Sequence, residues 1–544
     1  MGYPPHGRHW WRSRSLLALL VVVVLASSFA FGCAGRGAQP QGQPTEDQTL
    51  VFVNNLDPTT LDPHISNDAQ SNIFTLAMYE TLLRYKPNST ELEPWLAERY
   101  EVSKDGLEFT FYLRKGVKFH DGADLDAEAV KYSFERMKGV GMGLAFVLDP
   151  MAGIEAVDQY TVKITLSKPS VPFLQTIPNV FIVSPKSFKA NVKDNDWGRE
   201  WAYNHVAGTG PYRLTFWERG RRLQVEKFPD YWRGWQGKHI ERLVLVVADE
   251  PGTRRLMLEA GDVDMMIKLE DQVDDVAALK AKEGITVVIN PTLSATYIAM
   301  ACNRPPFSDV RVRKAVSYAF DYQTHNDIAY GGYALQAQGI LPKSMKFHND
   351  KLFMYSCDPE KARQLLAEAG YAGGFNADFC YVGSSGVQRR TSEILQSSLA
   401  KVGIQVAPSP MTWPTLLAKF QDPKTVPDMY NLNMHAAYPD PDYVLSRWVH
   451  SNATGQRGFN GGCYSNPRVD QLIDQGLVTY DEREREAMYK EVQEILVEDA
   501  PYIWVANPQY IVAMRSYVKN FSYVPAFSRT LGYVYDMYIE GKGR

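Results

Sequence analysis

Strand patterns and helix patterns alternate along almost the whole of this chain. Alternating apolar and polar residues at 107–119 predict a half-buried hairpin, and residues 161–166 predict a further strand. Apolar residues recur at helical spacing over 127–138, after Asp124 or Asp126 as a capping residue. This alternation limits the fold class to α/β or α+β.

The length of the chain requires more than one hydrophobic core. It has 544 residues, whereas a single core stops growing near about 250–300 residues, so we expect at least two lobes. A composition of 45% hydrophobic and 22% charged residues is typical of a globular protein and excludes a disordered or collagen-like chain. The net charge of -4 and the lack of a visible Lys/Arg cluster argue against a nucleic-acid partner.

The first 32 residues have the layout of a secretory signal peptide. Arg8, Arg12 and Arg14 form a basic segment that precedes an apolar run at 16–31. That run is shorter than the roughly 20 residues that a membrane-spanning helix needs. We therefore expect residues 1–32 to be removed on export.

The residues around Cys33 resemble a bacterial lipobox, in which cleavage leaves an N-terminal cysteine that carries lipid. Gly32 fits the small residue before the cysteine, whereas Ala30 and Phe31 depart from the usual pattern. Residues 33–48 are rich in Gly, Gln and Pro and predict a flexible tether. We expect lipidation at Cys33 and a location in the periplasmic space or on the outer face of the cytoplasmic membrane. The alternative is a soluble periplasmic protein.

Signatures of common catalytic, cofactor and metal sites are missing from the sequence. It contains no GxxxxGK[ST] phosphate loop, no GxSxG elbow and no HExxH pair. The glycines of Gly208-Thr209-Gly210 precede Pro211, which removes an amide donor that a dinucleotide site would need. Four cysteines beyond the leader form no CxxC pair and leave three disulfide pairings open; they are Cys302, Cys357, Cys380 and Cys463. We expect a protein that is not an enzyme and has no metal and no cofactor.

A series of short motifs provides the strongest functional signal. In chain order they are Leu61-Asp62-Pro63-His64, Met78-Tyr79-Glu80-Thr81-Leu82, Trp95-Leu96-Ala97-Glu98, the stretch from Thr110 to Gly122, Gly208-Thr209-Gly210-Pro211-Tyr212, Asp230-Tyr231-Trp232, Gly261-Asp262-Val263-Asp264, and the stretch from Pro306 to Ala315. In these motifs and their order the chain resembles the bacterial extracellular solute-binding proteins of family 5, the oligopeptide, dipeptide and nickel type. The likeness runs from about Leu50 to near the C-terminus.

The resemblance implies an α/β fold of the two-lobed periplasmic-binding-protein type (class II, cluster C) with an extra subdomain in lobe one. By this likeness lobe I takes residues 49–79, 184–297 and 505–544, its extra subdomain takes residues 80–183, and lobe II takes residues 298–504. The hinges are expected near Tyr297–Met300 and Ile503–Ala506. Closure of the lobes around a solute is the mechanism that the family implies.

The family also implies a peptide ligand held between the lobes. One carboxylate usually binds the peptide's α-amino group three residues before an acidic-Pro step, and the matching position here is Ala437, before Asp440-Pro441. A buried ammonium without a partner is costly. Either Asp440, Asp442 or Asp68 replaces the missing carboxylate, or the ligand has no free amine.

Further binding positions carried over from the family complete the expected site. They are Asn67, Trp413, Asn433, Met434, His435 and Tyr438. An oligosaccharide also suits these groups, because it offers hydroxyls and flat apolar faces. Nickel chelates and haem suit them less, since His435 is the one histidine near the expected cleft. The expected partners are a small-molecule solute, an ABC transporter permease pair with two ATPase subunits, and the membrane through a lipid anchor, and we expect a monomer.

Overall fold

The computed structural model describes residues 47–542 except Asn67, residues 456–457 and residues 528–529. The expected signal peptide, nearly all of the expected tether, and Cys33 lie outside this part. Within it, strands and helices alternate as predicted. None of the helices in the described part has the length and apolar character needed to cross a membrane.

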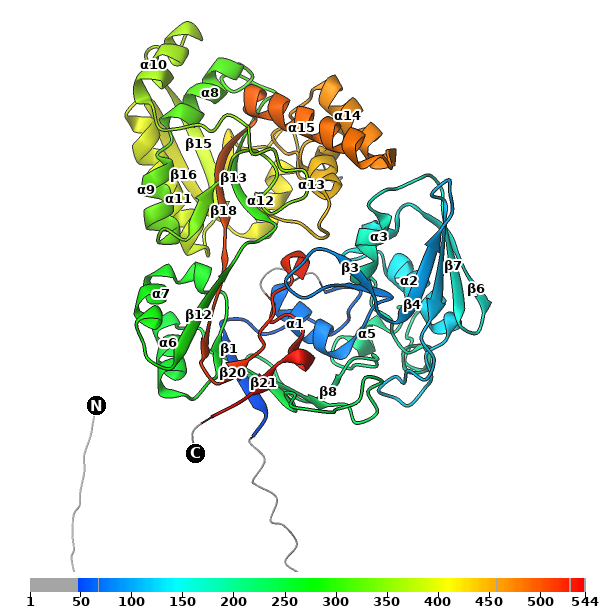
Figure 1. Cartoon of the computed structure of the whole chain (residues 1–544). Helices are drawn as coiled ribbons and strands as arrows, with labels where there is room; N and C mark the ends of the chain where they lie inside the picture. The colour runs from blue at the N-terminus through cyan, green and yellow to red at the C-terminus, as the bar shows by residue number, and fades with distance from the viewer. Residues whose placement is uncertain (1–46, 67, 456–457, 528–529, 543–544) are drawn as a thin grey trace, which may run out of the picture. The chain divides into compact units, whose positions relative to one another are not determined.

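A seven-stranded mixed sheet forms the first body of the chain, in the lower half of Figure 1. Its strands lie in the order β12-β19-β11-β1-β10-β9-β8, and β1 runs parallel to β10 and β11. The strands are β1 (Thr49–Asn54), β8 (Tyr212–Glu218), β9 (Arg222–Lys227), β10 (Arg242–Val247), β11 (Met265–Met266), β12 (Ile285–Asn290) and β19 (Tyr510–Arg515). The chain between them forms α1 (Ala69–Met78), α4 (Pro185–Ala190), α5 (Arg199–Ala202), α6 (Pro251–Ala260) and α7 (Val273–Lys280). Because β1, β10 and β11 are parallel, their carboxyl ends meet at one edge of the sheet.

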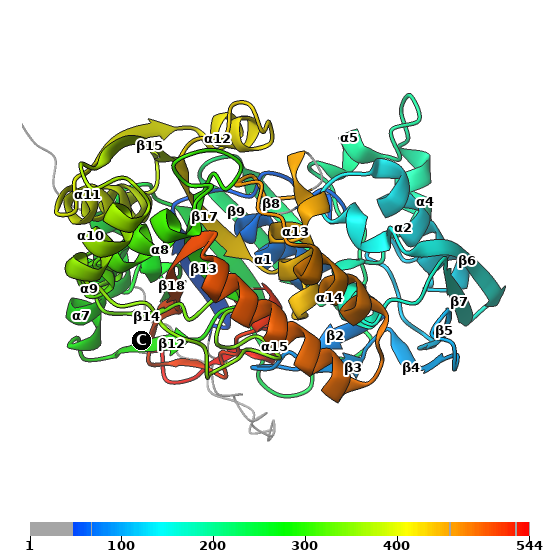
Figure 2. The same ribbon diagram turned by 90° about the horizontal axis from the view of Figure 1, so that it is seen from above.

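A six-stranded sheet forms the second body, in the order β14-β18-β13-β17-β15-β16. Its strands are β13 (Ser294–Met300), β14 (Ala334–Gln336), β15 (Phe375–Val382), β16 (Ile404–Met411), β17 (Met429–His435) and β18 (Tyr502–Pro508). Its helices are α8 (Val310–Ala319), α9 (Tyr322–Tyr330), α10 (Pro359–Glu368), α11 (Gly386–Ala400), α12 (Trp413–Phe420), α13 (Pro441–Trp448), α14 (Pro467–Val478) and α15 (Glu482–Asp499). Seen from above, α8 to α11 gather at one side of the molecule and α14 and α15 lie apart from them (Figure 2).

A four-stranded antiparallel sheet, in the order β4-β5-β7-β6, forms the segment inserted after α1. Its strands are β4 (Ala97–Val102), β5 (Glu108–Leu113), β6 (Met151–Asp158) and β7 (Thr161–Leu166), and the short pair β2 (Leu83–Tyr85) and β3 (Leu92–Pro94) precedes them. The predicted strand at 161–166 is confirmed as β7. The predicted helix is confirmed as α2 (Ala127–Val140), and Asp126 caps it by accepting a hydrogen bond from the Ala129 amide at 2.8 Å.

The predicted hairpin at 107–119 is wrong. Strand β5 ends at Leu113 and pairs with β4, which directly precedes it in the chain, and with the distant β7, and not with the residues that follow it. After the turn at Gly116, Val117 and Phe119 are fully buried outside any strand. Apolar and polar residues do alternate over 107–119, but the second half of that pattern lies in an irregular segment whose apolar side chains also pack into the core.

The chain passes between the two large sheets at two adjacent places. Strand β12 continues through residues 291–293 into β13, and β18 continues through Gln509 into β19 (Figure 1). The Thr292 hydroxyl donates a hydrogen bond to the Pro508 carbonyl at 2.5 Å, and the Asn507 amide donates to the Ser294 carbonyl at 3.5 Å. The two crossing segments therefore lie side by side and are bonded to each other.

A buried ion pair ties the loop after β1 to helix α2. Arg136 and Asp62 are both fully buried, and the guanidinium donates two hydrogen bonds to the carboxylate, at 2.8 and 2.6 Å. Arg136 also lies 2.9 Å from His64 Nδ1 and donates to the Trp197 carbonyl at 2.8 Å. Burial, together with the Arg136 charge, lowers the pKa of His64 to about 4. The motif Leu61-Asp62-Pro63-His64 thus has a structural role.

The variant Arg136→Met should lower the free energy of unfolding by about 3–5 kcal/mol, because it leaves the Asp62 carboxylate buried without a partner. Urea unfolding followed by circular dichroism measures the loss. The matched control is Arg99→Met, since the Arg99–Glu101 pair is exposed, and such a change should cost at most about 1 kcal/mol. Equal losses in the two variants would contradict the role assigned to the buried pair.

Stability should fall as the pH is lowered from about 6.5 towards 4, because the folded structure lowers the pKa of three histidines. Burial lowers the pKa of His64 and His120 to about 4 and that of His325 to about 3. Between these values and the unfolded pKa near 6.5, protons bind the unfolded chain and not the native one. Each histidine then adds up to about 1.4 kcal/mol of stability per pH unit gained. The variant His325→Gln should flatten the slope of melting temperature against pH, and His205→Gln, at an exposed position, should leave it unchanged.

Candidate functional site

A cavity of about 760 Å³ lies between the strand ends of the two large sheets. One wall of the cavity is lined by residues of the seven-stranded sheet that follow the parallel strands β1, β10 and β11. The other wall is lined by residues of the six-stranded sheet that follow β15 and β16, and by the last residues of β17. Ligand sites in open α/β sheets commonly lie at the carboxyl ends of strands. The volume is within the range of about 300–1,000 Å³ that small-molecule sites have.

Charged residues line the wall of the cavity that the seven-stranded sheet provides. They are Asp249, Arg254, Lys268 and Glu270. The Arg254 guanidinium donates hydrogen bonds at 2.6 Å to the carbonyls of Ala248 and Asp249, so it holds the turn between β10 and α6. Lys268 has φ +62° and ψ +42°, the left-handed conformation, at the start of the short helix Leu269–Asp271.

Hydroxyl, amide and aromatic groups line the opposite wall. They include Thr296, Tyr330, Ser384, Ser385, Gln388, Trp413, Asn433 and His435. The Thr296 hydroxyl lies 2.8 Å from the Tyr330 hydroxyl, and it donates a hydrogen bond to the side-chain oxygen Oδ1 of Asn433 at 3.2 Å. The Ser294 hydroxyl lies 2.7 Å from His435 Nδ1. These contacts fix the orientation of the polar groups that face the cavity.

Three of the residues carried over from the family meet at this cavity. Trp413, at the first turn of α12, keeps 42% of its surface exposed. Asn433 and His435 come from alternate positions of β17, so their side chains lie on the same face of that strand. Met434, between them, points to the other face and is fully buried in the core.

The residues that follow β17 are engaged in structural contacts outside this cavity. Asp440 caps α13 and accepts two hydrogen bonds from Arg485, at 2.8 and 2.7 Å. The Tyr438 hydroxyl donates to Asp442 at 3.0 Å, and burial, reinforced by Asp440, raises the pKa of Asp442. The Ala437 carbonyl accepts a hydrogen bond from the Asn179 amide at 3.1 Å. The carboxylates expected to replace the missing one are therefore already committed within the protein.

Asp68 is likewise committed to local structure. Its carboxylate caps α1 by accepting from the Ser71 amide at 2.8 Å, and it also accepts from the Thr59 hydroxyl at 2.6 Å. Asn67, the neighbouring expected position, lies outside the described residues.

Comparison with known proteins decides the family. The model of the bacterial extracellular solute-binding proteins, family 5 Middle, matches residues 91–456. Similar sequences include "Probable D,D-dipeptide-binding periplasmic protein DdpA" of Escherichia coli K12, 31% identical over 94% of this chain and 97% of the relative. Another is "Heme-binding protein A" of Haemophilus influenzae Rd, 29% identical over 97% of this chain and 98% of the relative.

Among solved structures, the periplasmic binding protein DppA of Helicobacter pylori in complex with the peptide STSA is similar. It superposes with a TM-score of 0.77 at 28% identity, over 90% of this chain and 98% of that one. The chain belongs to family 5 of the bacterial extracellular solute-binding proteins. The predicted family and the predicted two-lobed α/β fold are confirmed. We call the seven-stranded sheet with its helices lobe I, and the six-stranded sheet with its helices lobe II.

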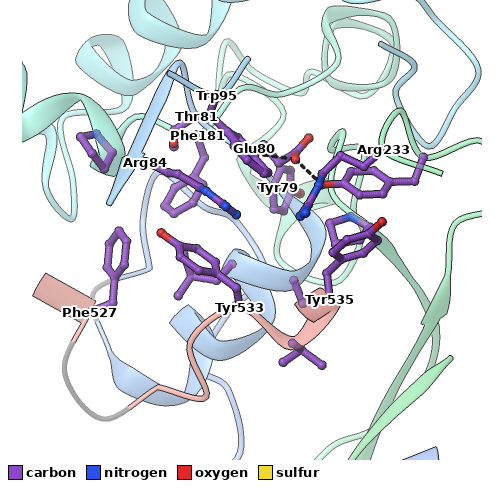
Figure 3. Close-up of a pocket in the computed structure, with 16 residues that line it drawn as sticks. Tyr79, Glu80, Thr81, Arg84, Trp95, Phe181, Arg233, Phe527, Tyr533 and Tyr535 are labelled. Atoms are coloured by element: carbon purple, nitrogen blue, oxygen red, sulfur yellow. Dashed lines mark hydrogen bonds between the residues drawn. The ribbon is translucent and has the colours of Figure 1, made fainter. Parts of the chain in front are cut away.

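This solute-binding protein has a second, smaller cavity inside lobe I, between the inserted segment and the C-terminal segment. It has about 40 Å³ of space. Figure 3 shows the side chains of Arg84 and Arg233 reaching towards it from opposite sides, above Tyr533 and Tyr535. The Arg84 guanidinium lies 3.3 Å from the centre of the Trp95 ring, and that of Arg233 lies 4.3 Å from the Tyr535 ring. The space is too small for a solute of several atoms.

Glu80 anchors the wall of this second cavity. Its carboxylate accepts hydrogen bonds from Trp95 Nε1 at 2.7 Å, from the Tyr231 hydroxyl at 2.8 Å and from the Thr209 hydroxyl at 2.8 Å, and Trp232 Nε1 lies 3.2 Å away. Burial raises the pKa of Glu80, and the hydrogen-bond donors oppose that rise. Four of the family motifs, at 78–82, 95–98, 208–212 and 230–232, thus meet at one carboxylate.

The described part of the chain contains neither a cluster of metal ligands nor a disulfide. Within it, no group of three His, Cys, Asp or Glu residues is arranged to hold a metal ion. The four cysteines Cys302, Cys357, Cys380 and Cys463 carry free thiols.

Sequence reasoning missed the charged wall of the main cavity. Asp249 follows β10, and Lys268 and Glu270 follow β11. A usable signal was available, because the motif Gly261-Asp262-Val263-Asp264 leads directly into β11. Residues just after a parallel strand collect at the carboxyl edge of the sheet, where ligands bind.

Proposed function

We propose that this protein captures small peptides outside the cytoplasm and delivers them to an ABC importer built from a permease pair and two ATPase subunits. It performs no reaction on the solute. It works as a monomer, anchored by lipid on Cys33, at the outer face of the cytoplasmic membrane or in the periplasmic space.

The cavity between the lobes carries this proposal. It joins a charged wall from lobe I to a hydroxyl- and amide-rich wall from lobe II, so a solute inside it contacts both lobes at once. A ligand that binds one arrangement of two lobes better than another shifts the population towards that arrangement. Capture and signalling to a transporter then need no chemistry beyond binding.

The two chain crossings are the proposed hinge. Residues 291–293 and Gln509 lie between the last strand of one sheet and the first of the other. The expected hinge ranges, Tyr297–Met300 and Ile503–Ala506, lie a few residues further into β13 and β18. Residues inside a bonded sheet are poorly placed to bend, so the short links outside the sheets are the better candidates.

Several contacts across the cleft would hold the closed form. The Asn179 amide donates to the Ala437 carbonyl at 3.1 Å, and the Val171 amide donates to the Leu477 carbonyl at 3.0 Å. The Arg447 guanidinium lies 4.2 Å from the centre of the Phe146 ring. In each pair one residue comes from the inserted segment and the other from lobe II, so opening would separate them.

Peptides are the favoured solutes because of the charges on the lobe I wall and because of the relatives. The Escherichia coli relative is described as binding a D,D-dipeptide, and the Helicobacter pylori structure holds the peptide STSA. That wall carries acidic and basic side chains together, Asp249, Lys268 and Glu270 among them, so its mixed charge suits a zwitterionic solute.

An oligosaccharide or another amine-free solute is the second candidate, and two observations favour it. Ala437 lacks the carboxylate that usually binds a peptide amine in this family. The Trp413 ring, 42% exposed at the cavity, offers a flat apolar face for a sugar.

A thermal-shift screen separates the two candidates. Di- to pentapeptides should raise the melting temperature, since a ligand at about 1,000 times its Kd adds about 4 kcal/mol to the stability of the native state. Cello- and xylo-oligomers should give no shift. Small-angle scattering on the same samples should show compaction with each stabilising peptide. A shift with the sugars and none with peptides would favour the second candidate, and no compaction with any solute would contradict solute capture.

The variant Asn179→Ala should weaken peptide binding roughly 3- to 10-fold, because it removes a cross-cleft hydrogen bond worth about 1 kcal/mol from the closed form. Isothermal titration calorimetry measures the change. Asn191→Ala is the matched control, since its amide donates within lobe I, to the Ser187 carbonyl of α4 at 2.8 Å. An unchanged Kd in Asn179→Ala would show that this contact does not contribute to closure.

A further inference from the structure

Two cysteines of lobe II meet beyond the end of β13 that lies away from the crossing between the lobes. The Cys302 amide donates a hydrogen bond to the Gly462 carbonyl at 2.7 Å. A Cβ at Gly462 would lie 2.5 Å from the Met300 carbonyl oxygen, so glycine is needed for the two backbones to come this close. This close approach places Cys302 next to Cys463.

The backbone hydrogen bond limits the distance between the two cysteines. Standard bond lengths and the 2.7 Å from the Cys302 nitrogen to the Gly462 oxygen hold the Cα atoms of Cys302 and Cys463 within about 7 Å of each other. A disulfide can join two cysteines at such a separation without a large movement of the backbone.

The two sulfurs flank the same aromatic ring. Burial, and after it the charges of Cys302 and Cys463, raise the pKa of the Tyr502 hydroxyl. In this structure each thiol is free and donates to a carbonyl two residues before it, Cys302 to Met300 and Cys463 to Gly461, both at 3.4 Å. A rotation about the single Cα–Cβ bond releases each sulfur from its carbonyl.

The backbone of Cys463 gives a second, independent indication. Its φ of +55° lies in the left-handed region, which disfavours a residue with a Cβ and which glycine adopts freely. The two residues before it, Gly461 and Gly462, are glycines, but the left-handed position itself holds a cysteine. A covalent bond through its sulfur would offset the cost of a side chain at this position.

The other two cysteines of lobe II have separate surroundings. Cys357 is exposed, and its sulfur lies 3.9 Å from the Ala319 carbonyl. Cys380 is buried in β15, with its sulfur 3.9 Å from the Asp378 carboxylate. Of the pairings that the sequence left open, the structure therefore favours one bond, between Cys302 and Cys463.

Burial also determines what kind of disulfide this pair would form. It raises the pKa of the Cys302 thiol to about 11, and it raises the pKa of the Cys463 thiol. Thiols with a low pKa gain stability in the reduced state as thiolates, which makes their disulfides reactive. A pair with raised pKa values gains no such stability, so its disulfide would be structural.

We propose that Cys302 and Cys463 form a disulfide outside the cytoplasm and that this bond stabilises lobe II; the inference rests on the extracytoplasmic location proposed above and not on solute capture. The two thiols lose two protons and two electrons as the S–S bond forms. A disulfide oxidant takes up both and is reduced to two thiols. The bond encloses residues 303–462, which include strands β14 to β17 and helices α8 to α13. It thus restricts the unfolded state of most of lobe II.

The test treats the full chain with oxidised glutathione, blocks the remaining thiols with iodoacetamide and maps tryptic peptides by mass spectrometry without a reductant. We expect one cross-linked peptide that contains Cys302 and Cys463 and is lost after dithiothreitol. Scanning calorimetry should give the oxidised protein a melting temperature roughly 5–10 °C above that of the reduced protein.

Cys302→Ser and Cys463→Ser should each abolish the difference between oxidised and reduced samples, and the double variant should behave like either single variant. Because each variant is compared with itself, changes in packing caused by serine cancel. Cys357→Ser, at an exposed position, is the matched control and should keep both the peptide and the shift.

Absence of the cross-linked peptide, or a bond from either cysteine to glutathione or to another cysteine, would overturn the pairing. Equal melting temperatures of the oxidised and reduced wild-type protein would overturn the stabilising role. Neither measurement involves a solute, so a failure here leaves solute capture standing, and a failed solute screen leaves the disulfide standing.

Discussion

The two side-by-side crossings between the large sheets determine how the two lobes face each other, and the position of the cavity depends on that arrangement. Strands β12 and β19 are paired in one sheet, β13 and β18 are paired in the other, and the links between them are bonded through Thr292 and Asn507. Two adjacent links allow two bodies to rotate about a common line while each sheet stays intact. They also fix which edges face each other, and those are the edges at which the parallel strands end.

Buried carboxylates stiffen the bodies on either side of the cavity. Asp62 is bound by Arg136, Glu80 by four donors, and Asp440 by Arg485. Each carboxylate joins segments that are distant in the sequence, so these contacts make each lobe rigid. A lobe that is rigid in itself transmits the position of a small solute to its outer surface, which is what a transporter would have to detect.

Elements that depend on local features of the sequence were predicted correctly. Elements whose form depends on which other strands they pair with were not. Helix α2 was placed within two residues because its cap Asp126 and its apolar spacing are local features. The hairpin at 107–119 failed because β5 pairs with the strand before it, β4, and with the distant β7, and not with the residues that follow it; nothing within 107–119 marks that choice. The family motifs gave the two-lobed fold, yet several of them, including Asp62 and Glu80, turned out to be packing residues. Of the binding positions, Trp413, Asn433 and His435 meet at the cavity, whereas the charged residues of lobe I required the three-dimensional sheet edge to be recognised.

The left-handed backbone at Lys268 implies a conflict between folding and affinity. Glycine at this position would relieve the strain and increase the stability of lobe I, but it would also delete one of the two neighbouring charges at the cavity. A substitution to glycine there would therefore change the backbone of lobe I and the lining of the cavity at the same time.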